Sequence, residues 1–354
     1  MPQPTGARRA RWSCRSRHHA RVCVPGRQTR PSFRLVSVSP VHAAADVLVI
    51  GEALIDTVDS VNSDAGAHTE HVGGSPANVA FGLATLGHPV VLGTWFGRDE
   101  HGRRITEACQ RHGVRLVPGS DNAAATPVAF AALDADGRAT YRFEFTWQLP
   151  AAAAQPEPAI GHLHTGSIAA IHEPGGSDVL HLVRALREQA TISYDPNIRP
   201  ELMGAPAAVR DRVEALVEAS DIVKASDEDL EWLYPGSFIP DILRAWAALG
   251  PDLVVVTLGS AGAVYAVSSP SGAEAAVVPA RAESVVDTVG AGDSFMAGLI
   301  SGLLDAEMLG SPAARSRLHD AVLTDVRPAL ERAATTSAAT VAQAGAYYPG
   351  RAEF

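Results

Sequence analysis

Apolar residues follow two kinds of pattern from residue 46 to the C-terminal end of the chain. Short continuous apolar runs are typical of strands buried on both faces, and the stretches between them repeat apolar residues every three or four positions, as helices do. The two patterns alternate, which predicts an α/β fold whose mainly parallel sheet is covered on both faces. The expected strands are 46–50, 89–96, 163–166, 191–195, 221–224 and 253–257, and the expected helices among the later ones are 177–189, 207–219, 226–234 and 241–249.

A strictly alternating pattern occupies residues 126–132 and 139–146, with turn-forming residues at 134–137 between them. This arrangement predicts a β-hairpin. The aromatic residues of its second strand fall on one face, at Tyr141, Phe143 and Phe145. Two roles stay open for this aromatic stripe, which are packing within the protein and contact with a second copy of the chain.

Residues 1–44 differ from the rest of the chain because they are rich in Arg, Pro and Ser and have no hydrophobic periodicity. Such a composition predicts a disordered extension, followed by one large domain at 45–354. The extension resembles an organelle transit peptide. Translation from too early a start codon explains the same composition, and we favour that second interpretation.

Composition limits the classes of function. The chain has 354 residues, 46% of them apolar, yet no apolar run is long enough to span a membrane, so we expect a soluble protein. Its three cysteines lack metal-type spacing and fit a reducing cytoplasm. The net charge is −10 although the first 45 residues hold nine arginines and no acidic residue, so the remainder is strongly acidic and an improbable partner for nucleic acid.

Residues 287–298, Asp-Thr-Val-Gly-Ala-Gly-Asp-Ser-Phe-Met-Ala-Gly, carry the most specific chemical signal. Gly290, Ala291 and Gly292 let backbone N–H groups approach an anion, and a helical pattern follows from Asp293. The helix dipole favours a charged carboxylate there, so Asp293 can accept a proton from a hydroxyl held beside bound phosphates. A lone loop of this kind is more often an ordinary helix cap, so the assignment depends on its surroundings.

A second glycine-rich helix start lies at residues 73–78, Gly-Gly-Ser-Pro-Ala-Asn, where Ser75 is the expected N-cap. Gly73 and Gly74 permit close approach of the backbone to a ligand, and Asn78 lies one turn into the helix, where its amide can face that ligand.

Asp56 follows the first expected strand. Ligands of open α/β sheets bind beyond the carboxyl ends of the strands, so this carboxylate is placed to accept hydrogen bonds from the hydroxyl groups of a bound ligand. The alternative is a solvated loop aspartate.

Together the two glycine-rich segments resemble the end signatures of the ribokinase-like, or PfkB, sugar kinases, and the resemblance extends over about residues 46–349. It implies a three-layer α/β/α fold with a small β lid built from parts of about 57–72, 88–97 and 126–147. It also implies that Asp293 is the catalytic base, that the amides of Gly290, Ala291 and Gly292 form an anion hole, and that Gly73, Gly74 and Asn78 bind the sugar.

Further segments resemble other parts of the family's site. The run Asp-Pro-Asn-x-Arg at 195–199 is similar to one in bacterial fructokinases, and we assign Arg199 to the sugar and Asn197 to the nucleotide. Residues 257–262 resemble the family's nucleotide loop. Lys224, the sole lysine, is expected either to neutralise phosphate or simply to end a strand. The expected nucleotide contacts are therefore Asn197, Lys224, Thr257, Gly259 and Gly262.

Residues 226–229, Ser-Asp-Glu-Asp, fall where the family's Asn-x-x-Glu motif organises Mg²⁺ and water near the phosphates. The match is partial, since Ser226 and Asp229 replace the Asn and the Glu. Glu228 and Asp229 are the candidate metal residues, acting through water, but Ser-x-x-Asp before a helix is also a capping box. The implied cofactors are ATP and Mg²⁺, and a monovalent cation such as K⁺ stays open.

The expected function is ATP-dependent phosphorylation of a sugar hydroxyl, and the 195–199 run favours fructose. Kinases of 2-keto-3-deoxygluconate, ribose or nucleosides remain alternatives, as does a catalytically silent sugar-binding regulator. The sole lysine does not lie in a Walker A loop, and no Gly-x-Gly-x-x-Gly follows the first strand, which argues against P-loop and dinucleotide-binding classes. The expected partners are the sugar and ATP, without nucleic acid or membrane, and a homodimer through the lid stays open.

Overall fold

The computed structural model describes residues 46–59, 68–133, 139–156, 159–268 and 272–354. The expected disorder of residues 1–44 and the expected turn at 134–137 lie outside the described residues. The side chains of Tyr141 and Phe143 do so as well.

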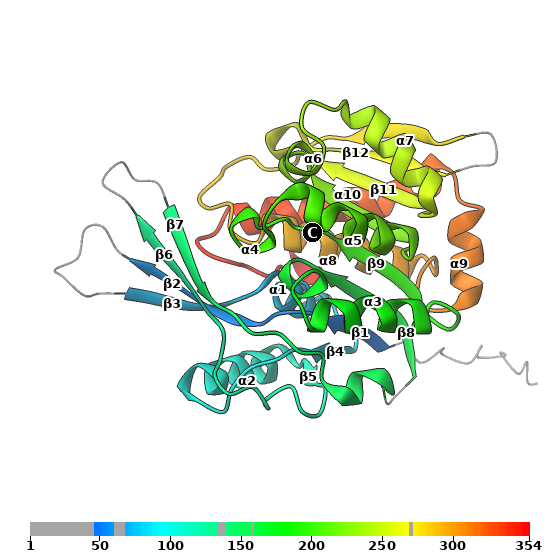
Figure 1. Ribbon diagram of the computed structural model, residues 1–354. Helices are drawn as coiled ribbons and strands as arrows, with labels where there is room; N and C mark the ends of the chain where they lie inside the picture. Colours follow the sequence, from blue (N-terminus) through cyan, green and yellow to red (C-terminus); the bar gives the residue numbers. More distant parts are fainter. Residues whose placement is uncertain (1–45, 60–67, 134–138, 157–158, 269–271) are drawn as a thin grey trace, which may run out of the picture. The chain divides into compact units, whose positions relative to one another are not determined.

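A nine-stranded sheet forms the centre of the protein (Figure 1). All neighbouring strands pair in parallel except the two pairs that involve β12, which are antiparallel. The mainly parallel sheet expected from the sequence is therefore confirmed. Its strand order is β13 (Glu274–Val278), β12 (Ala263–Val267), β11 (Leu253–Thr257), β10 (Ile222–Ser226), β9 (Thr191–Asp195), β8 (Ile160–Gly166), β1 (Asp46–Ile50), β4 (Val90–Gly93) and β5 (Arg115–Leu116).

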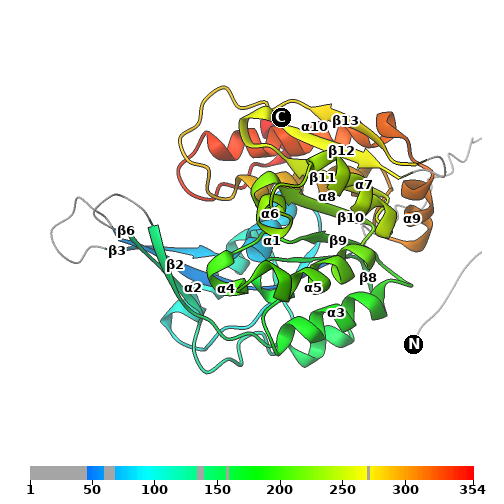
Figure 2. The same ribbon diagram turned by 45° about the horizontal axis from the view of Figure 1, so that its top comes forward.

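Helices cover both faces of this sheet (Figures 1 and 2). Successive strand residues point to opposite faces, so Val47 and Val49 of β1 join one apolar core and Leu48 and Ile50 join another. The first core includes α1 (Ser75–Thr85), α2 (Glu100–His112), α8 (Ala291–Asp305) and α10 (Leu323–Val341), and the second includes α3 (Gly175–Leu186), α5 (Pro206–Glu218), α6 (Asp227–Leu233) and α7 (Ile239–Leu249). Two cores separated by one sheet confirm the three-layer architecture. The remaining helices are α4 (Pro200–Met203) and α9 (Pro312–His319).

Three of the six expected strands have the expected limits. Of the others, β8 starts three residues before the expected range 163–166, and β4 covers only four residues of the expected range 89–96. Residues 46–50, 191–195 and 253–257 form β1, β9 and β11 as expected. The strand expected at 221–224 instead starts one residue later, because Asp221 uses its carboxylate to accept the Ile192 N–H at 2.6 Å and to pair with Arg315 at 2.6 Å.

A four-stranded sheet, called the lid sheet below, lies at one side of the main sheet, on the left in Figure 1. Its order is β3 (His68–Gly73), β2 (Leu54–Asp59), β6 (Val128–Leu133) and β7 (Ala139–Glu144). The expected hairpin is thus present as the antiparallel pair β6 and β7. The expectation that residues 88–97 also belong to the lid is wrong, because β4 pairs with β1 and β5 in the main sheet. All four residues of β4 are buried, as expected for a strand inside the main sheet.

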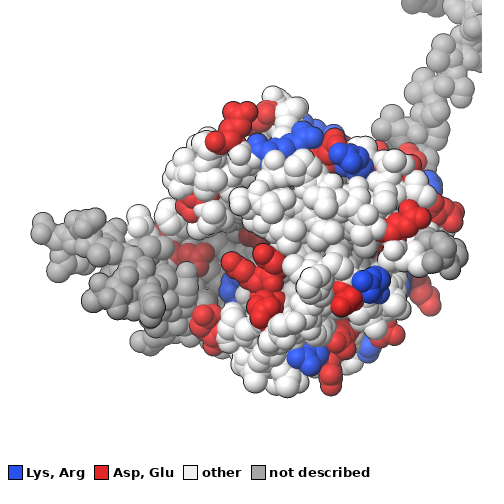
Figure 3. Space-filling view, turned by 90° about the horizontal axis from the view of Figure 1, so that it is seen from above, with Lys and Arg blue, Asp and Glu red and all other residues white. Residues whose placement is uncertain are grey.

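None of the helices in the described ranges is both long and apolar enough to cross a bilayer. On the face seen in Figure 3, acidic side chains gather near the centre, and basic side chains are scattered among them. This distribution matches the acidic net charge of the chain.

Candidate active site

Asp293 lies in the first turn of α8, two residues after Ala291 opens the helix. Gly290 is the N-cap, with a φ of 75°, so the backbone turns sharply just before the helix. The Asp293 carboxylate is buried and accepts two hydrogen bonds, from Ser75 Oγ at 2.7 Å and from Asn78 Nδ2 at 2.8 Å. The two glycine-rich helix starts of the sequence therefore meet at this carboxylate.

Ser75 does not cap α1, contrary to expectation. Gly74 is the N-cap and Ser75 is the first helical residue, without a side-chain cap hydrogen bond. The Ser75 hydroxyl instead reaches across to Asp293, a residue on another helix. A tertiary partner has replaced the local one, and the sequence motif holds no signal for that exchange.

Asn78 is held at both ends of its side-chain amide. Its Nδ2 donates to Asp293, and its Oδ1 accepts the Tyr348 hydroxyl at 2.6 Å. Tyr348 comes from the C-terminal tail and carries no recognised motif, so sequence reasoning missed it. Asn78, which the resemblance assigned to the sugar, also contacts the candidate base directly.

Asp56 belongs to the lid sheet, where it lies on β2 opposite His71. Its carboxylate packs so closely on Gly73 that a Cβ there would lie 1.9 Å from Asp56 Oδ2. Only a glycine therefore fits at position 73. Burial raises the pKa of Asp56 to about 6, Arg199 and His71 act to lower it, and Asp293 raises it. The charges of Arg199 and Asp293 thus both reach Asp56, which indicates that these three predicted site residues lie near one another.

The predicted role of Asp56 in sugar binding can be tested through pH, because burial raises the pKa of its carboxyl to about 6. Below about pH 6 the carboxyl is neutral and loses acceptor capacity, so the sugar KM should rise as pH falls from 7.5 to 5. In Asp56→Asn, sugar binding should be weaker by about 1 to 3 kcal/mol at pH 7.5, and this acid-side rise should vanish. Steady-state kinetics across this pH range measure both effects, with the ATP KM as the internal control. An unchanged pH profile of the sugar KM in Asp56→Asn would remove Asp56 from the sugar site.

Lys224 forms a buried ion pair with Asp195, whose Oδ2 lies 2.8 Å from Lys224 Nζ. Burial raises the pKa of Asp195 to about 6 although Lys224 lowers it. Burial alone would lower the pKa of Lys224, but Asp195, Asp229 and Asp293 outweigh it and hold that pKa above its usual value. A Cβ at Gly292 would lie 3.2 Å from Lys224 Nζ, so this ammonium group is next to the loop of Gly290, Ala291 and Gly292, called the anion loop below. Asp195 is a further site residue to which sequence reasoning gave no role.

The turn after β9 holds Asn197 and Arg199 together. Asn197 has a positive φ of 37°, and its backbone N–H donates to Asp195 Oδ1 at 3.2 Å. Arg199 Nη1 donates to Asn197 Oδ1 at 2.8 Å and to the Ile198 carbonyl at 2.9 Å. Arg199 is half-buried, so the turn is a structured part of the site and Arg199 is more than a surface arginine.

Asp229 forms the capping box that competed with its metal role. Asp229 N donates to Ser226 Oγ at 3.0 Å, and Asp229 Oδ2 accepts the Ser226 N–H at 2.8 Å. Its other oxygen, Oδ1, accepts the Ile198 N–H at 2.7 Å. Both oxygens of Asp229 are therefore engaged by the backbone, which favours the structural role. Glu228 is exposed and stays available as a carboxylate.

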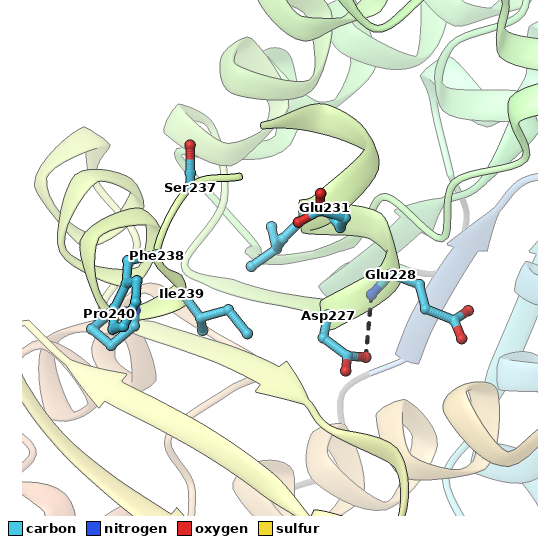
Figure 4. A pocket seen from close by; sticks show the side chains of 8 residues that line it. Asp227, Glu228, Glu231, Ser237, Phe238, Ile239 and Pro240 are labelled. Carbon is cyan, nitrogen blue, oxygen red and sulfur yellow. Dashed lines mark hydrogen bonds between the residues drawn. The ribbon is translucent and has the colours of Figure 1, made fainter. Parts of the chain in front are cut away.

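Glu228 also borders a hollow of about 510 Å³ between α6 and the start of α7 (Figure 4). Asp227, Glu231 and Phe238 are among its other lining residues. Asp293, Lys224 and Asp56 do not line it, so the hollow is separate from the cluster around the candidate base.

The loop after β11 lies at the carboxyl ends of the parallel strands, next to β10, the strand that carries Lys224. Thr257 ends β11 and pairs in register with Ser226 of β10. Gly259 opens a short 3-10 turn, and a Cβ there would meet no described heavy atom within 4 Å, so its backbone is open to a ligand. Gly262 has a φ of 92°, and a Cβ there would lie 2.2 Å from the Val278 carbonyl oxygen. The fold alone therefore requires a glycine at position 262.

A family model described as pfkB family carbohydrate kinase matches residues 44–352. A fructokinase of Rhizobium leguminosarum bv. trifolii is 33% identical over 268 residues, which cover 73% of this chain and 79% of that protein. A fructokinase of Klebsiella pneumoniae is 34% identical over 268 residues, covering 73% of this chain and 84% of that protein.

Solved structures agree in fold. A fructokinase double mutant from Vibrio cholerae O395, with fructose, ADP and a potassium ion bound, aligns with a TM-score of 0.70 at 26% identity, covering 87% of this chain and 96% of that one. A fructokinase from Xylella fastidiosa with bound ATP aligns with a TM-score of 0.74 at 23% identity, covering 88% and 97%. At that lower identity the likeness concerns the fold alone.

Proposed function

Because the chain belongs to the pfkB family of carbohydrate kinases, we propose that it transfers the γ-phosphoryl group of ATP to a hydroxyl group of fructose, with Asp293 as general base. The observation that carries the proposal is the setting of Asp293. This carboxylate lies in the first turn of a helix, receives two side-chain hydrogen bonds, and follows a glycine loop beside the Lys224 ammonium.

The proton transfer depends on the free lone pairs of Asp293. An ionised carboxylate offers about four acceptor positions, and Ser75 and Asn78 use one on each oxygen. The remaining positions can receive the proton of a sugar hydroxyl, which makes the hydroxyl oxygen a better nucleophile. Ser75 and Asn78 fix the carboxylate in one orientation, so that little reorganisation is needed at the moment of attack.

Charge on the transferred phosphoryl group is stabilised in this proposal by the backbone N–H groups of Gly290, Ala291 and Gly292 at the start of α8. They add the positive end of the helix dipole to hydrogen-bond donation. Lys224 supplies a full positive charge at the same place. Its partner Asp195 holds the ammonium group in a fixed position, since both side chains are buried.

Mg²⁺ is part of the proposal as a companion of ATP. When bound, it neutralises phosphate charge, and it usually keeps several waters and takes only one or two protein carboxylates. The described residues hold no group of three or more His, Cys, Asp or Glu suited to a metal. Glu228 is the protein carboxylate that we assign to it. We also include a monovalent cation, on the example of the potassium ion in the Vibrio structure, without assigning its ligands.

Fructose is preferred among the sugars because the curated relatives of 33% and 34% identity are fructokinases. The half-buried Arg199 beside Asp56 supports a pocket for a polyhydroxy ligand. An aminoimidazole riboside kinase from Salmonella enterica shares the fold at 23% identity, so a nucleoside is included among the acceptors to be tested.

A panel of acceptors with ATP, followed by ADP release, tests the sugar assignment. We expect fructose to give the highest kcat/KM, above ribose, 2-keto-3-deoxygluconate and a nucleoside, since kcat/KM ratios report differential binding of the transition state. A higher value for any of the other three would reassign the substrate while leaving the kinase chemistry in place.

Two further assignments belong to the proposal. The cysteine of the described ranges, Cys109, is buried and free, which fits a reducing cytoplasm. Within the described residues β7 is an outer strand of the lid sheet, and an outer strand can pair with a second copy of the chain.

A further inference from the structure

The C-terminal tail reaches into the candidate active site through one side chain. Tyr348 lies 270 residues after Asn78 in the sequence, yet its hydroxyl donates to Asn78 Oδ1 at 2.6 Å. Asn78 Nδ2 in turn donates to Asp293 Oδ2 at 2.8 Å. A continuous line of two hydrogen bonds therefore joins the tail to the candidate base.

The direction of these hydrogen bonds matters for the amide. An asparagine side-chain amide donates through its NH2 group and accepts through its oxygen, and rotating the amide by half a turn exchanges these two groups. Only the orientation with Nδ2 toward Asp293 gives the carboxylate a donor. A tyrosine hydroxyl beside Oδ1 can donate to that oxygen, so it stabilises this orientation of Asn78.

Tyr348 itself is well fixed. Its ring packs edge-on against Phe81, with 5.6 Å between centroids, and against His112, with 5.1 Å. Burial raises the pKa of Tyr348, and the charges of Asp293 and Asp56 raise it further, so its hydroxyl keeps its proton.

The tail is anchored on both sides of Tyr348. Before it, Gly345 N donates to Asp287 Oδ2 at 2.8 Å, which also connects the tail to the segment leading into the anion loop. After it, Arg351 Nη2 donates to Asp305 Oδ1 at 2.9 Å. The position of the Tyr348 hydroxyl therefore does not depend on its single bond to Asn78.

We propose that Tyr348 is a positioning residue for phosphoryl transfer, which acts by holding the Asn78 amide with its N–H group toward Asp293. This inference rests on the proposed function, since it assigns Asp293 as the base. Tyr348 makes no contact with the substrate in this role. Its effect reaches the reaction through Asn78 alone.

Tyr348→Phe tests the role, because it removes the hydroxyl and keeps the ring in its aromatic packing. We expect kcat to fall roughly 3- to 10-fold, the rate equivalent of one net hydrogen bond, with the ATP KM unchanged. The matched control is Tyr347→Phe, since the Tyr347 hydroxyl bonds only to Glu353 among described partners, at 2.6 Å. That control should keep wild-type kcat within about twofold, the usual scale for a surface change.

A double-mutant cycle separates positioning from a general loosening of the tail. In an Asn78→Ala background the amide is gone, so adding Tyr348→Phe should change kcat by less than about twofold. Wild-type kcat in Tyr348→Phe, or the same fold-loss in both backgrounds, would overturn the inference while the kinase activity of the wild type still stands. A wild-type protein without turnover would overturn the proposed function, and the inference with it.

Discussion

Asp293→Asn is expected to lower kcat by roughly 10² to 10⁴, the range typical for loss of a general base. Asparagine has nearly the same shape and remains compatible with the first turn of a helix, so the fold should persist. The amide cannot take the proton of the attacking hydroxyl. It also offers a single acceptor oxygen to the two donors, Ser75 and Asn78, that now bind separate carboxylate oxygens.

Three measurements on Asp293→Asn separate chemistry from binding and folding. They are kcat with fructose, ATP affinity by calorimetry, and the melting temperature, of which only kcat should change strongly. Asp320→Asn makes the same chemical change at an exposed position after α9 and should behave as the wild type. If Asp293→Asn kept more than about a tenth of wild-type kcat, another group would have to be the base.

Lys224→Met should have the largest effect on stability. It removes one partner of a buried ion pair and leaves Asp195 uncompensated, for which losses of about 3 to 5 kcal/mol in the free energy of unfolding are typical. The pKa of Asp195 is already raised to about 6 with Lys224 present, so without it the carboxyl should become protonated near neutral pH, which limits the loss. The kcat should fall as well, because the positive charge beside Gly292 is gone.

The double variant Lys224→Met with Asp195→Asn distinguishes the two roles of Lys224. Both side chains are then neutral, so urea unfolding at pH 7 should recover most of the lost stability. The kcat should stay low, since the phosphate still lacks its cation. Recovery of kcat together with stability would show that Lys224 serves the fold alone.

The main sheet and its helices could be predicted because their signal is local. The apolar run at 253–257 matches β11, as is typical of a strand buried on both faces, and the expected range 191–195 matches β9 although Thr191, Ser193 and Asp195 are polar. The anion loop was equally visible, because glycines and an aspartate at a helix start form a compact local pattern.

The remaining errors concern long-range contacts. Ser75 looked like an N-cap because capping is a local preference, but its hydroxyl finds Asp293, which is 218 positions away. Residues 88–97 were assigned to the lid by resemblance, while the burial of β4 on both faces places it in the main sheet. Tyr348 lies in no motif, and its hydrogen bond to Asn78 of α1 joins segments that are 270 positions apart.

Asp229 shows a third case, in which one short pattern supports two roles. Ser-x-x-Asp before a helix predicts a capping box as readily as a metal motif, and nothing within residues 226–229 decides between them. The deciding contact is the Ile198 N–H on Asp229 Oδ1, which comes from the turn after a neighbouring strand.

A single-turnover experiment tests the central claim most directly. Wild-type protein in excess over ATP is mixed with fructose, and the formation of fructose phosphate is followed with time, in parallel with Asp293→Asn. We predict one fructose phosphate per ATP in the wild type, and transfer roughly 10² to 10⁴ times slower in Asp293→Asn from an equally well bound ATP. Equal rates in the two proteins, or ATP bound by the wild type without transfer to fructose, would contradict the account.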